Sequence, residues 1–310
     1  MSISLAADTG VAQDQSSLDQ SSLDRVAQYQ RDGYLLLPSF LADDWLARLR
    51  AAAAEYVEKS RELTASTRLI DVEPGHTAEQ PRLRRLVSPV DVHPDFYELA
   101  ISGPIAQLAC ELLGGAARFH HSKLNYKWAD GGEEVQWHQD IQFWPHTDFS
   151  PLTIGVYLED VDDEMGPMAV LSGSQTGPLY DLYDDGGKWA GAMRTDDIDA
   201  LGLDSGDAAL SWLQGPAGSV TVHNCCIVHG SRPNQSDRGR PLLLQTYSAI
   251  DSYPIAHIGA NGVTGKVSGT VIGSTSSQTI TVADRTMHGA PDWSTAGGPP
   301  TIFGSQQAVR

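Results

Sequence analysis

The stretch Gln136-Trp-His-Gln-Asp-Ile-Gln-Phe-Trp-Pro-His-Thr-Asp148 has strand character at its start and places His138 and Asp140 two residues apart. Side chains at positions i and i+2 of an extended segment point to the same side, so this imidazole and this carboxylate converge. The pair supplies two thirds of a metal site made of two histidines and one carboxylate. A surface histidine and aspartate at a strand end is the alternative interpretation, because His-x-Asp is common by chance. The metal hypothesis therefore requires a second histidine.

The charge of the chain limits its partners. Lys and Arg number 21 against 39 Asp and Glu, which gives a net charge of −18 over 310 residues. Such a surface repels phosphate, so we expect no nucleic-acid partner and no anionic membrane surface. No apolar run approaches the roughly 20 residues that span a bilayer. The N-terminus lacks the pattern of a secretion signal. Cys110, Cys225 and Cys226 are too few for a disulfide framework, which favours a reducing, cytoplasmic location.

The chain order predicts one catalytic domain between two tails. Residues 1–20 are polar and repeat the pentapeptide Gln-Ser-Ser-Leu-Asp, which indicates a disordered leader. We place the domain at residues 21–256, and residues 257–310 form a Gly/Ser/Thr-rich extension. Within the domain, the early chain predicts helices that begin near Ser21, Asp43 and Pro104. Residues 63–90 are expected to be irregular and hold a basic cluster: Arg68, Arg82, Arg84 and Arg85.

From Ala117 onward the pattern is that of strands. Residues 118–128 carry polar groups on both alternating sides, which is typical of one wall of a barrel around a polar ligand. We expect a hairpin over Thr153–Glu159 and Met168–Ser172, and further strands at 218–228 and 241–250. Residues 177–215 lack a clear period and are predicted to be a lid-like insertion. Helices early and strands later favour an α+β, mainly β class: a double-stranded β-helix (jelly roll, cupin-like) with N-terminal helices packed on one sheet.

His229 is the best candidate for the second histidine. It ends an apolar run, Val220–Val228, and precedes Gly230, so its side chain can project from a strand end. His223 lies six residues earlier, on the same face of the expected strand, so parity alone does not choose between them. Arg240 favours His229, because it starts the next, antiparallel strand. A cosubstrate with two carboxylates that chelates a metal at one end needs a fixed cation at the other, and the planar fork of arginine suits that task.

These motifs, in this order, resemble those of a known enzyme family. His138-Gln-Asp140, Gly166-Pro-Met, Gly173-Ser, His229-Gly-Ser231-x-x-Asn234-x-Ser236 and Arg240 are similar to the motifs of the phytanoyl-CoA dioxygenase-like family of Fe(II)/2-oxoglutarate-dependent oxygenases. The resemblance covers about residues 25–250. It implies that His138, Asp140 and His229 hold Fe(II), and that Arg240 and Ser231 bind the distal carboxylate of 2-oxoglutarate.

The resemblance also implies further contacts with the cosubstrate. Gln139 and Lys127 match positions that touch 2-oxoglutarate in some members, and Tyr157 matches an aromatic residue that flanks it. Related halogenases carry a small residue in place of the metal carboxylate, so the presence of Asp140 argues against halogenation.

We therefore expect an enzyme that uses Fe(II), 2-oxoglutarate and O2 to hydroxylate an unactivated C–H bond of a small metabolite, such as an amino acid or a natural-product intermediate. An acyl-CoA would want a broader basic groove for its phosphates. The same centre can desaturate, cyclise or epimerise, and a non-catalytic jelly-roll protein that binds a metal or a ligand is the alternative of another class. A monomer or a homodimer is expected. Candidate substrate contacts are Asn125, Phe143, Trp144, His146 and Arg194, whereas His120 and His121 are interpreted as structural.

Overall fold

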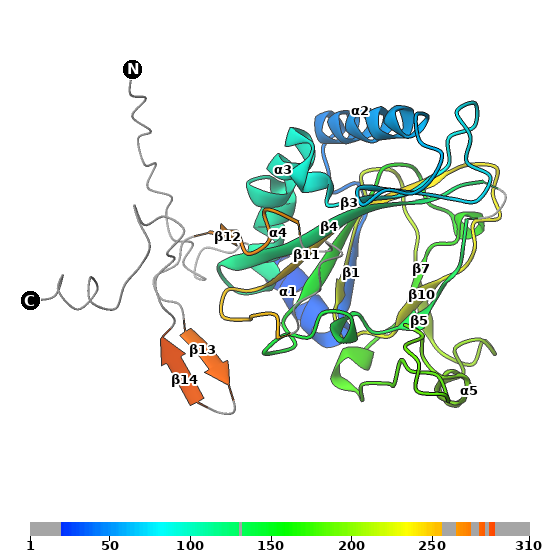
Figure 1. Cartoon of the computed structure of the whole chain (residues 1–310). Coiled ribbons are helices and arrows are strands. Elements are labelled where there is room, and N and C mark those ends of the chain that lie inside the picture. Colours follow the sequence, from blue (N-terminus) through cyan, green and yellow to red (C-terminus); the bar gives the residue numbers. More distant parts are fainter. Residues whose placement is uncertain (1–19, 130–131, 256–264, 274–278, 283–284, 289–310) are drawn as a thin grey trace, which may run out of the picture. The chain divides into compact units, whose positions relative to one another are not determined.

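The computed structural model describes residues 20–129, 132–255, 265–273, 279–282 and 285–288 (Figure 1). Residues 1–19 of the expected leader, and much of the expected extension, lie outside the described residues. The chain divides into two compact units, residues 1–274 and 275–310. The described part of the second unit is an antiparallel pair, β13 (Thr279–Val282) and β14 (Arg285–His288).

Two antiparallel sheets build the first unit. The small sheet has the order β5 (Val135–His138), β10 (His229–Ser231), β7 (Met168–Leu171) and β8 (Leu210–Leu213). The large sheet includes β12 (Val271–Ile272), a strand from beyond residue 256 that pairs with β4 (Ala117–Lys127). Its members are, in spatial order, β1 (Tyr34–Leu37), β9 (Val220–Asn224), β6 (Leu152–Tyr157), β11 (Arg240–Ala249), β4 (Ala117–Lys127), β3 (Leu83–Val87) and β2 (Ile70–Val72), with β12 (Val271–Ile272) beside β4.

The helices cover one face of the large sheet, and the small sheet lies on its other side (Figure 1). They are α1 (Gln20–Asp32), α2 (Asp43–Ser60), α3 (Pro94–Ile101) and α4 (Pro104–Leu112). Alternate strand residues such as Ile154, Val222 and Leu243 join the helices in one hydrophobic core. The residues between them face the small sheet and are largely polar. The predicted double-stranded β-helix with helices on one sheet is therefore confirmed.

A glycine ends α1 as its sequence predicts. Gly33 has φ +78°, a left-handed conformation that glycine adopts without strain, and its N–H donates to the Tyr29 carbonyl at 2.8 Å. This turn leads directly into β1, which pairs with β9 at the edge of the large sheet.

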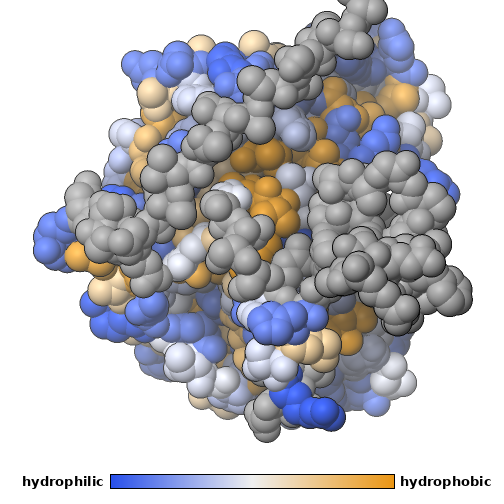
Figure 2. All heavy atoms as spheres, turned by 90° about the vertical axis from the view of Figure 1, so that its left-hand side faces the viewer, coloured by the Kyte–Doolittle hydropathy of each residue, from blue (hydrophilic) through white to orange (hydrophobic). Residues whose placement is uncertain are grey.

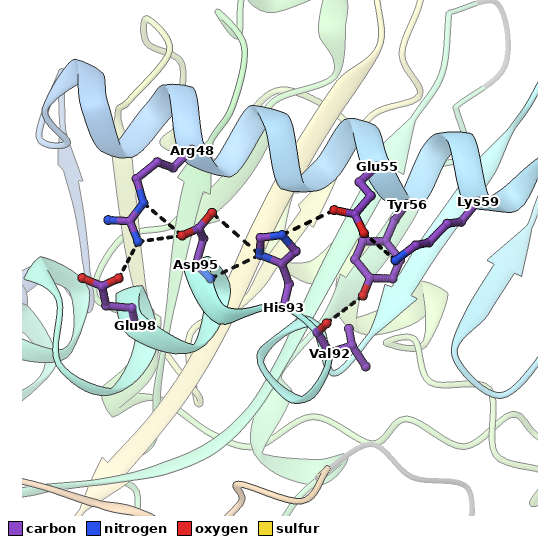
Figure 3. Close-up of polar contacts among 8 residues, drawn as sticks. All are labelled: Arg48, Glu55, Tyr56, Lys59, Val92, His93, Asp95 and Glu98. Atoms are coloured by element: carbon purple, nitrogen blue, oxygen red, sulfur yellow. Dashed lines mark hydrogen bonds and ion pairs between the residues drawn. The ribbon is translucent and has the colours of Figure 1, made fainter.

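Polar contacts fix α2 against α3 (Figure 3). The Arg48 guanidinium contacts both Asp95, at 2.6 Å, and Glu98. About two turns further along α2, the hydroxyl of the buried Tyr56 donates to the Val92 carbonyl at 2.9 Å. The hydroxyl satisfies a carbonyl just before α3, and the ion pairs orient the two helices over the outer face of the sheet.

The side that lies to the left in Figure 1 is seen face-on in Figure 2. Hydrophobic residues form patches near its centre, and hydrophilic residues surround them. Apolar surface of this kind is usual in globular proteins. None of the helices in the described ranges is long and apolar enough to cross a membrane.

Two predictions of local structure were wrong. Residues 63–90 contain β2 and β3 rather than irregular chain, because the buried Leu83 and Leu86 anchor β3 between its arginines. The segments around β6 and β7 do not form a hairpin: β6 pairs with β9 and β11 in the large sheet, whereas β7 pairs with β8 and β10 in the small one. The acidic turn between them carries the chain from one sheet to the other.

The segment 177–215 is more than a lid. It contains α5 (Thr195–Leu201) and β8, and its Leu182, Met193 and Leu203 pack with Trp137 in a second hydrophobic core. Most of the segment therefore belongs to the folded body beside the small sheet. A lid role remains a prediction for the part around Trp189.

Candidate metal centre

Three side chains converge where the small sheet ends. His138 is the last residue of β5, Asp140 opens a 3-10 turn (Asp140–Gln142), and His229 opens β10 directly opposite His138. Their ligand atoms all lie within 4.8 Å of one another. Asp140 Oδ1 is 3.6 Å from His138 Nε2 and 3.9 Å from His229 Nε2. Two ligands that are each about 2 Å from one ion can be at most about 4 Å apart, and both distances between the carboxylate and an imidazole meet this limit, so the group has a spacing suited to a single metal ion.

Hydrogen bonds orient both imidazoles. His138 Nδ1 donates to the Gln136 carbonyl at 2.7 Å, and His229 Nδ1 donates to the Ile227 carbonyl at 3.1 Å. With the proton on Nδ1, each Nε2 offers its lone pair to a metal. Burial lowers the pKa of His229 well below its usual value, and the nearby His138 and His223 lower it further, so the neutral, metal-binding form is favoured.

Asp140 is held as a carboxylate by the histidines around it. Burial by itself raises the pKa of Asp140, but the surrounding His138, His223 and His229 outweigh it and keep the pKa well below the usual value. His223 Nε2 donates to Asp140 Oδ2 at 3.2 Å, and Thr153 Oγ1 donates to the same oxygen at 3.4 Å. The large sheet thus holds Oδ2, while Oδ1 is the oxygen nearest to His138 and His229.

The competition between His223 and His229 is resolved by a chain reversal that the sequence pattern did not reveal. We expected both on one strand, but β9 ends at Asn224, and a turn at Cys225 and Cys226 carries the chain to the small sheet. His223 and His229 therefore face each other from different sheets, with ring centroids 4.5 Å apart. His223 supports Asp140, and His229 completes the group of three.

His223→Ala is expected to weaken metal binding by about 10- to 100-fold, as is typical for a residue that orients a ligand. At saturating Fe(II), 2-oxoglutarate turnover should largely return. Anaerobic metal titration measures the effect, with His288→Ala, at an exposed position on β14, as the control. Turnover that stays absent at high Fe(II) would indicate that His223 itself is a metal ligand.

A buried arginine lies beside this centre. Arg240 starts β11 opposite Lys127 of β4. Its Nη1 donates to the Gly166 carbonyl at 2.7 Å, its Nε has no partner, and no carboxylate within the described ranges lies within 4.0 Å of it. Burial lowers the pKa of Arg240, but a guanidinium keeps its proton at ordinary pH. A buried cation without a counterion is costly, so this position suits an anionic ligand.

Two of the motif segments position Arg240. Gly166 has φ +62°, and a Cβ there would lie 2.2 Å from the Arg232 carbonyl, so only glycine fits beneath the guanidinium. Asn234 Nδ2 donates to the carbonyls of Lys127 and Arg238, and its Oδ1 accepts from Ser236. These bonds close the turn that leads into β11.

Lys127 and Ser231 lie together next to Arg240. Lys127 Nζ donates to Ser231 Oγ at 2.7 Å and to the Arg232 carbonyl at 2.5 Å. Burial, with help from Arg240, lowers the pKa of Lys127 to about 6. Arg240 is therefore the dependable cation of this group, and Lys127 and Ser231 add hydrogen-bonding capacity beside it.

The two other expected cosubstrate contacts differ in outcome. Tyr157 lies across from Leu242, and its buried hydroxyl donates to the Leu213 carbonyl at 2.5 Å, so only its ring is available to flank a ligand. For Gln139, a contact with 2-oxoglutarate stays a prediction, and its side chain is already bonded within the protein. Its amide donates to the carbonyls of Pro178 and Cys226 and accepts from the Tyr180 N–H, because it points to the opposite side from His138 and Asp140. These bonds tie the metal motif to Pro178, Tyr180 and Cys226.

Four of the five expected substrate contacts follow the metal motif within a few residues or lie on the polar face of β4. Phe143 packs edge-on against His138, with centroids 5.6 Å apart, and against Trp189 at 5.2 Å. Trp144 and His146 are buried near His120, and Asn125 lies on the polar face of β4. Arg194 is the exception: it pairs with Asp185 and lines a separate pocket of about 470 Å³ beside Trp137 that includes none of the three ligand residues.

The polar face of β4 holds a feature that strict alternation missed. A β-bulge at His120 shifts the register with β11 between Thr246 and Tyr247, so Phe119 joins the hydrophobic core. His120 and His121 then lie on the same side, with their Nδ1 atoms 2.7 Å apart. Strict alternation would place Phe119 and His121 on one side of the strand and His120 on the other. The two adjacent polar residues His120 and His121, which directly follow the core residue Phe119, were the sequence signal for this bulge.

The residues present fit Fe(II) and a chelating keto acid. Two imidazoles and one carboxylate on one face leave coordination positions open, which is the ligand set of non-haem Fe(II) oxygenases. The orphaned Nε of Arg240 provides a place for a distal carboxylate. The arrangement can therefore hold a metal and a dicarboxylate side by side.

The chain is similar in sequence and in fold to known proteins. The family model described as phytanoyl-CoA dioxygenase matches residues 29–242. A probable alpha-ketoglutarate-dependent hypophosphite dioxygenase of Stutzerimonas stutzeri is 32% identical over 76% of this chain and 81% of its own length. The L-proline trans-4-hydroxylase of Streptomyces griseoviridis is 30% identical over 77% and 90%. The crystal structure of EctD from S. alaskensis with 2-oxoglutarate and 5-hydroxyectoine has a TM-score of 0.63 at 22% identity, covering 80% of this chain and 84% of EctD.

Proposed function

We propose that this chain, which belongs to the phytanoyl-CoA dioxygenase family and is an Fe(II)/2-oxoglutarate-dependent dioxygenase, hydroxylates a C–H bond of a small free metabolite. The observation that carries this proposal is the convergence of His138, Asp140 and His229 beside a buried Arg240 that has no carboxylate partner in the described chain. In the proposed roles, His138, Asp140 and His229 ligate Fe(II), and Arg240 and Ser231 bind the distal carboxylate of 2-oxoglutarate.

When bound, Fe(II) with 2-oxoglutarate and O2 supplies the oxidising chemistry, with succinate and CO2 as by-products. The residues of the chain supply position. The two oriented imidazoles and the carboxylate fix one face of the metal, and Arg240 sets the direction in which the keto acid extends. The aromatic rings of Phe143 and Trp144 limit the water that reaches this side of the centre.

A small substrate is favoured over an acyl-CoA by the state of the basic cluster. Arg82 pairs with Glu73 at 2.8 Å, and Arg84 contacts Glu133 at 3.1 Å, so both are already engaged. These two pairs reduce the positive charge that the cluster offers to the phosphates of a CoA. The relatives named above act on hypophosphite and L-proline, which are small molecules.

A cytoplasmic location and a monomeric or homodimeric state complete the proposal. Cys110, Cys225 and Cys226 are free thiols in the structure, which agrees with a reducing compartment. The oligomeric state is measured directly by light scattering of the purified protein.

Succinate formation tests the function. The purified chain with Fe(II), 2-oxoglutarate and O2 is expected to release succinate slowly without substrate and faster with one. Product mass then separates the outcomes of the centre: hydroxylation adds one oxygen atom, desaturation removes two hydrogen atoms, and epimerisation leaves the mass unchanged. Absence of any 2-oxoglutarate turnover, coupled or uncoupled, would favour a non-catalytic binding protein instead.

A further inference from the structure

Four cationic side chains lie on the polar face of the large sheet. Arg240 and Lys127 are register partners, Lys123 is on the same face of β4 opposite Leu244, and Arg85 of β3 lies opposite Asn125. Within the described part of the chain, none of the four has a carboxylate within 4.0 Å. By contrast, cations elsewhere on this acidic protein, such as Arg25 or Arg50, pair with glutamates at 2.9 and 2.8 Å.

The cosubstrate accounts for only two of these cations. One carboxylate of 2-oxoglutarate goes to the metal and the other to Arg240, with Lys127 beside it in its network with Ser231. Lys123 and Arg85 are therefore not used by the proposed function. Arg85 Nε donates to Asn125 Oδ1 at 3.2 Å, which directs the arginine toward β4 and the side of Lys123.

Lys123 borders a group of buried polar atoms without partners. Its Nζ lies 5.6 Å from the centre of the Trp144 ring, which packs against His121, and His120 packs against His146 with centroids 5.0 Å apart. His120 Nε2, Trp144 Nε1 and His146 Nε2 have no hydrogen-bond partner within the described ranges, although these three side chains are at most 6% exposed. Buried polar atoms are nearly always paired, so an unpaired group of them beside a cation indicates a polar ligand.

We propose that Lys123 and Arg85 bind a compact oxyanionic group of the substrate, with the unpartnered indole N–H of Trp144 completing the contacts and, when its Nδ1 accepts from His121, the Nε2–H of His120 as a further donor. This inference rests on the proposed function and narrows its substrate class to small carboxylates or phosphorus oxyanions. Such a group would orient the rest of the molecule across Trp144 toward His138, since Trp144 packs against Phe143 and Phe143 packs against His138.

The charges around Lys123 agree with this role. Burial lowers the pKa of Lys123, the Asp140 carboxylate raises it, and Arg85 lowers it further. A bound oxyanion would favour the charged amine and relieve the repulsion between the two cations.

Paired ligands test the proposal without relying on turnover. The Tm of the Fe(II)- and 2-oxoglutarate-loaded protein is measured anaerobically with a panel of small carboxylates, each beside its primary amide, and small phosphonates, each beside its dimethyl ester. L-Proline and L-prolinamide form one pair. Compounds that raise the Tm are expected to be the acids, and the amide or ester partner should bind about 10- to 100-fold more weakly, because it loses the charge-assisted hydrogen bonds of the oxyanion. The two halves of the panel separate carboxylate from phosphonate.

Variants connect the selectivity to the two residues. Lys123→Met and Arg85→Met are expected to abolish the preference for the acid, Lys123→Arg should retain it, and the exposed Lys188→Met should leave it unchanged. The Tm rise given by 2-oxoglutarate in each variant reports an intact metal centre.

The outcomes are separable. The proposal is overturned if no acid in the panel stabilises the protein more than its amide or ester partner. It is also overturned if the preference for the acid survives in both methionine variants. Uncoupled succinate formation in the same protein would then leave the proposed function standing. Loss of both 2-oxoglutarate binding and turnover in the unaltered chain would remove the proposed function as well.

Discussion

His229→Ala is expected to abolish 2-oxoglutarate turnover and to weaken Fe(II) binding by about 100-fold. Four-ligand structural zinc sites gain about 10–16 kcal/mol from the metal, so one ligand accounts for about 3 kcal/mol, or about 100-fold in affinity. The effect on turnover exceeds the effect on binding, because a metal held by His138 and Asp140 alone is free to shift relative to Arg240. Anaerobic titration with Fe(II) and a succinate assay measure the two effects.

Comparison with His223→Ala makes this result specific. Both histidines are buried. The Nε2 of His229 lies 3.9 Å from Asp140 Oδ1, and the Nε2 of His223 lies 3.2 Å from Asp140 Oδ2, so general damage to the core would affect the two variants alike. We expect excess Fe(II) to restore the His223 variant and not the His229 variant. The reverse order, or equal rescue of both, would contradict the assignment of His229 as the third ligand.

The convergence of the three candidate ligands could be predicted in part, because two of them are close in sequence. His138 and Asp140 lie two residues apart in or beside a strand, and a histidine before a glycine at the start of β10 needed only to be near them. The helices were predictable from local sequence as well. Gly33 and Pro104 mark a helix end and a helix start through their own backbone preferences.

What the sequence pattern missed depends on how distant segments meet. The change of sheet between β6 and β7, and again after Asn224, leaves no mark in hydrophobic periodicity, because the strands on both sides of each change are buried along most of their length. The bulge at His120 is defined by its register with β11 rather than by its own residues. For Gln139, the pattern did not reveal the bonds that its side chain makes on the opposite side from His138 and Asp140.

Arg240→Ala is expected to raise the dissociation constant for 2-oxoglutarate by at least about 30-fold, since the loss of one partner of a buried charge pair costs about 2 kcal/mol or more. Fe(II) binding should change little, because Arg240 contacts the Gly166 carbonyl and none of the three metal ligands in the described hydrogen bonds. The visible band that forms when 2-oxoglutarate is added anaerobically to the Fe(II) protein measures the affinity. The band should reappear only at high 2-oxoglutarate.

Two matched variants separate the charge of Arg240 from its shape. Arg240→Lys keeps a cation but loses the planar fork and the bond pattern to Gly166, so its affinity for 2-oxoglutarate should be intermediate. Arg238→Ala removes a cation only two residues away that pairs with Asp162 at the surface, and it should bind 2-oxoglutarate as the unaltered protein does. Lys127 has a lowered pKa, and its Nζ already donates to Ser231 Oγ and to the Arg232 carbonyl. We therefore expect that Lys127 does not compensate for the missing guanidinium. If the Arg240→Ala protein binds 2-oxoglutarate with unchanged affinity, Lys127 rather than Arg240 holds the distal carboxylate. The roles that we assign to these two cations would then be exchanged.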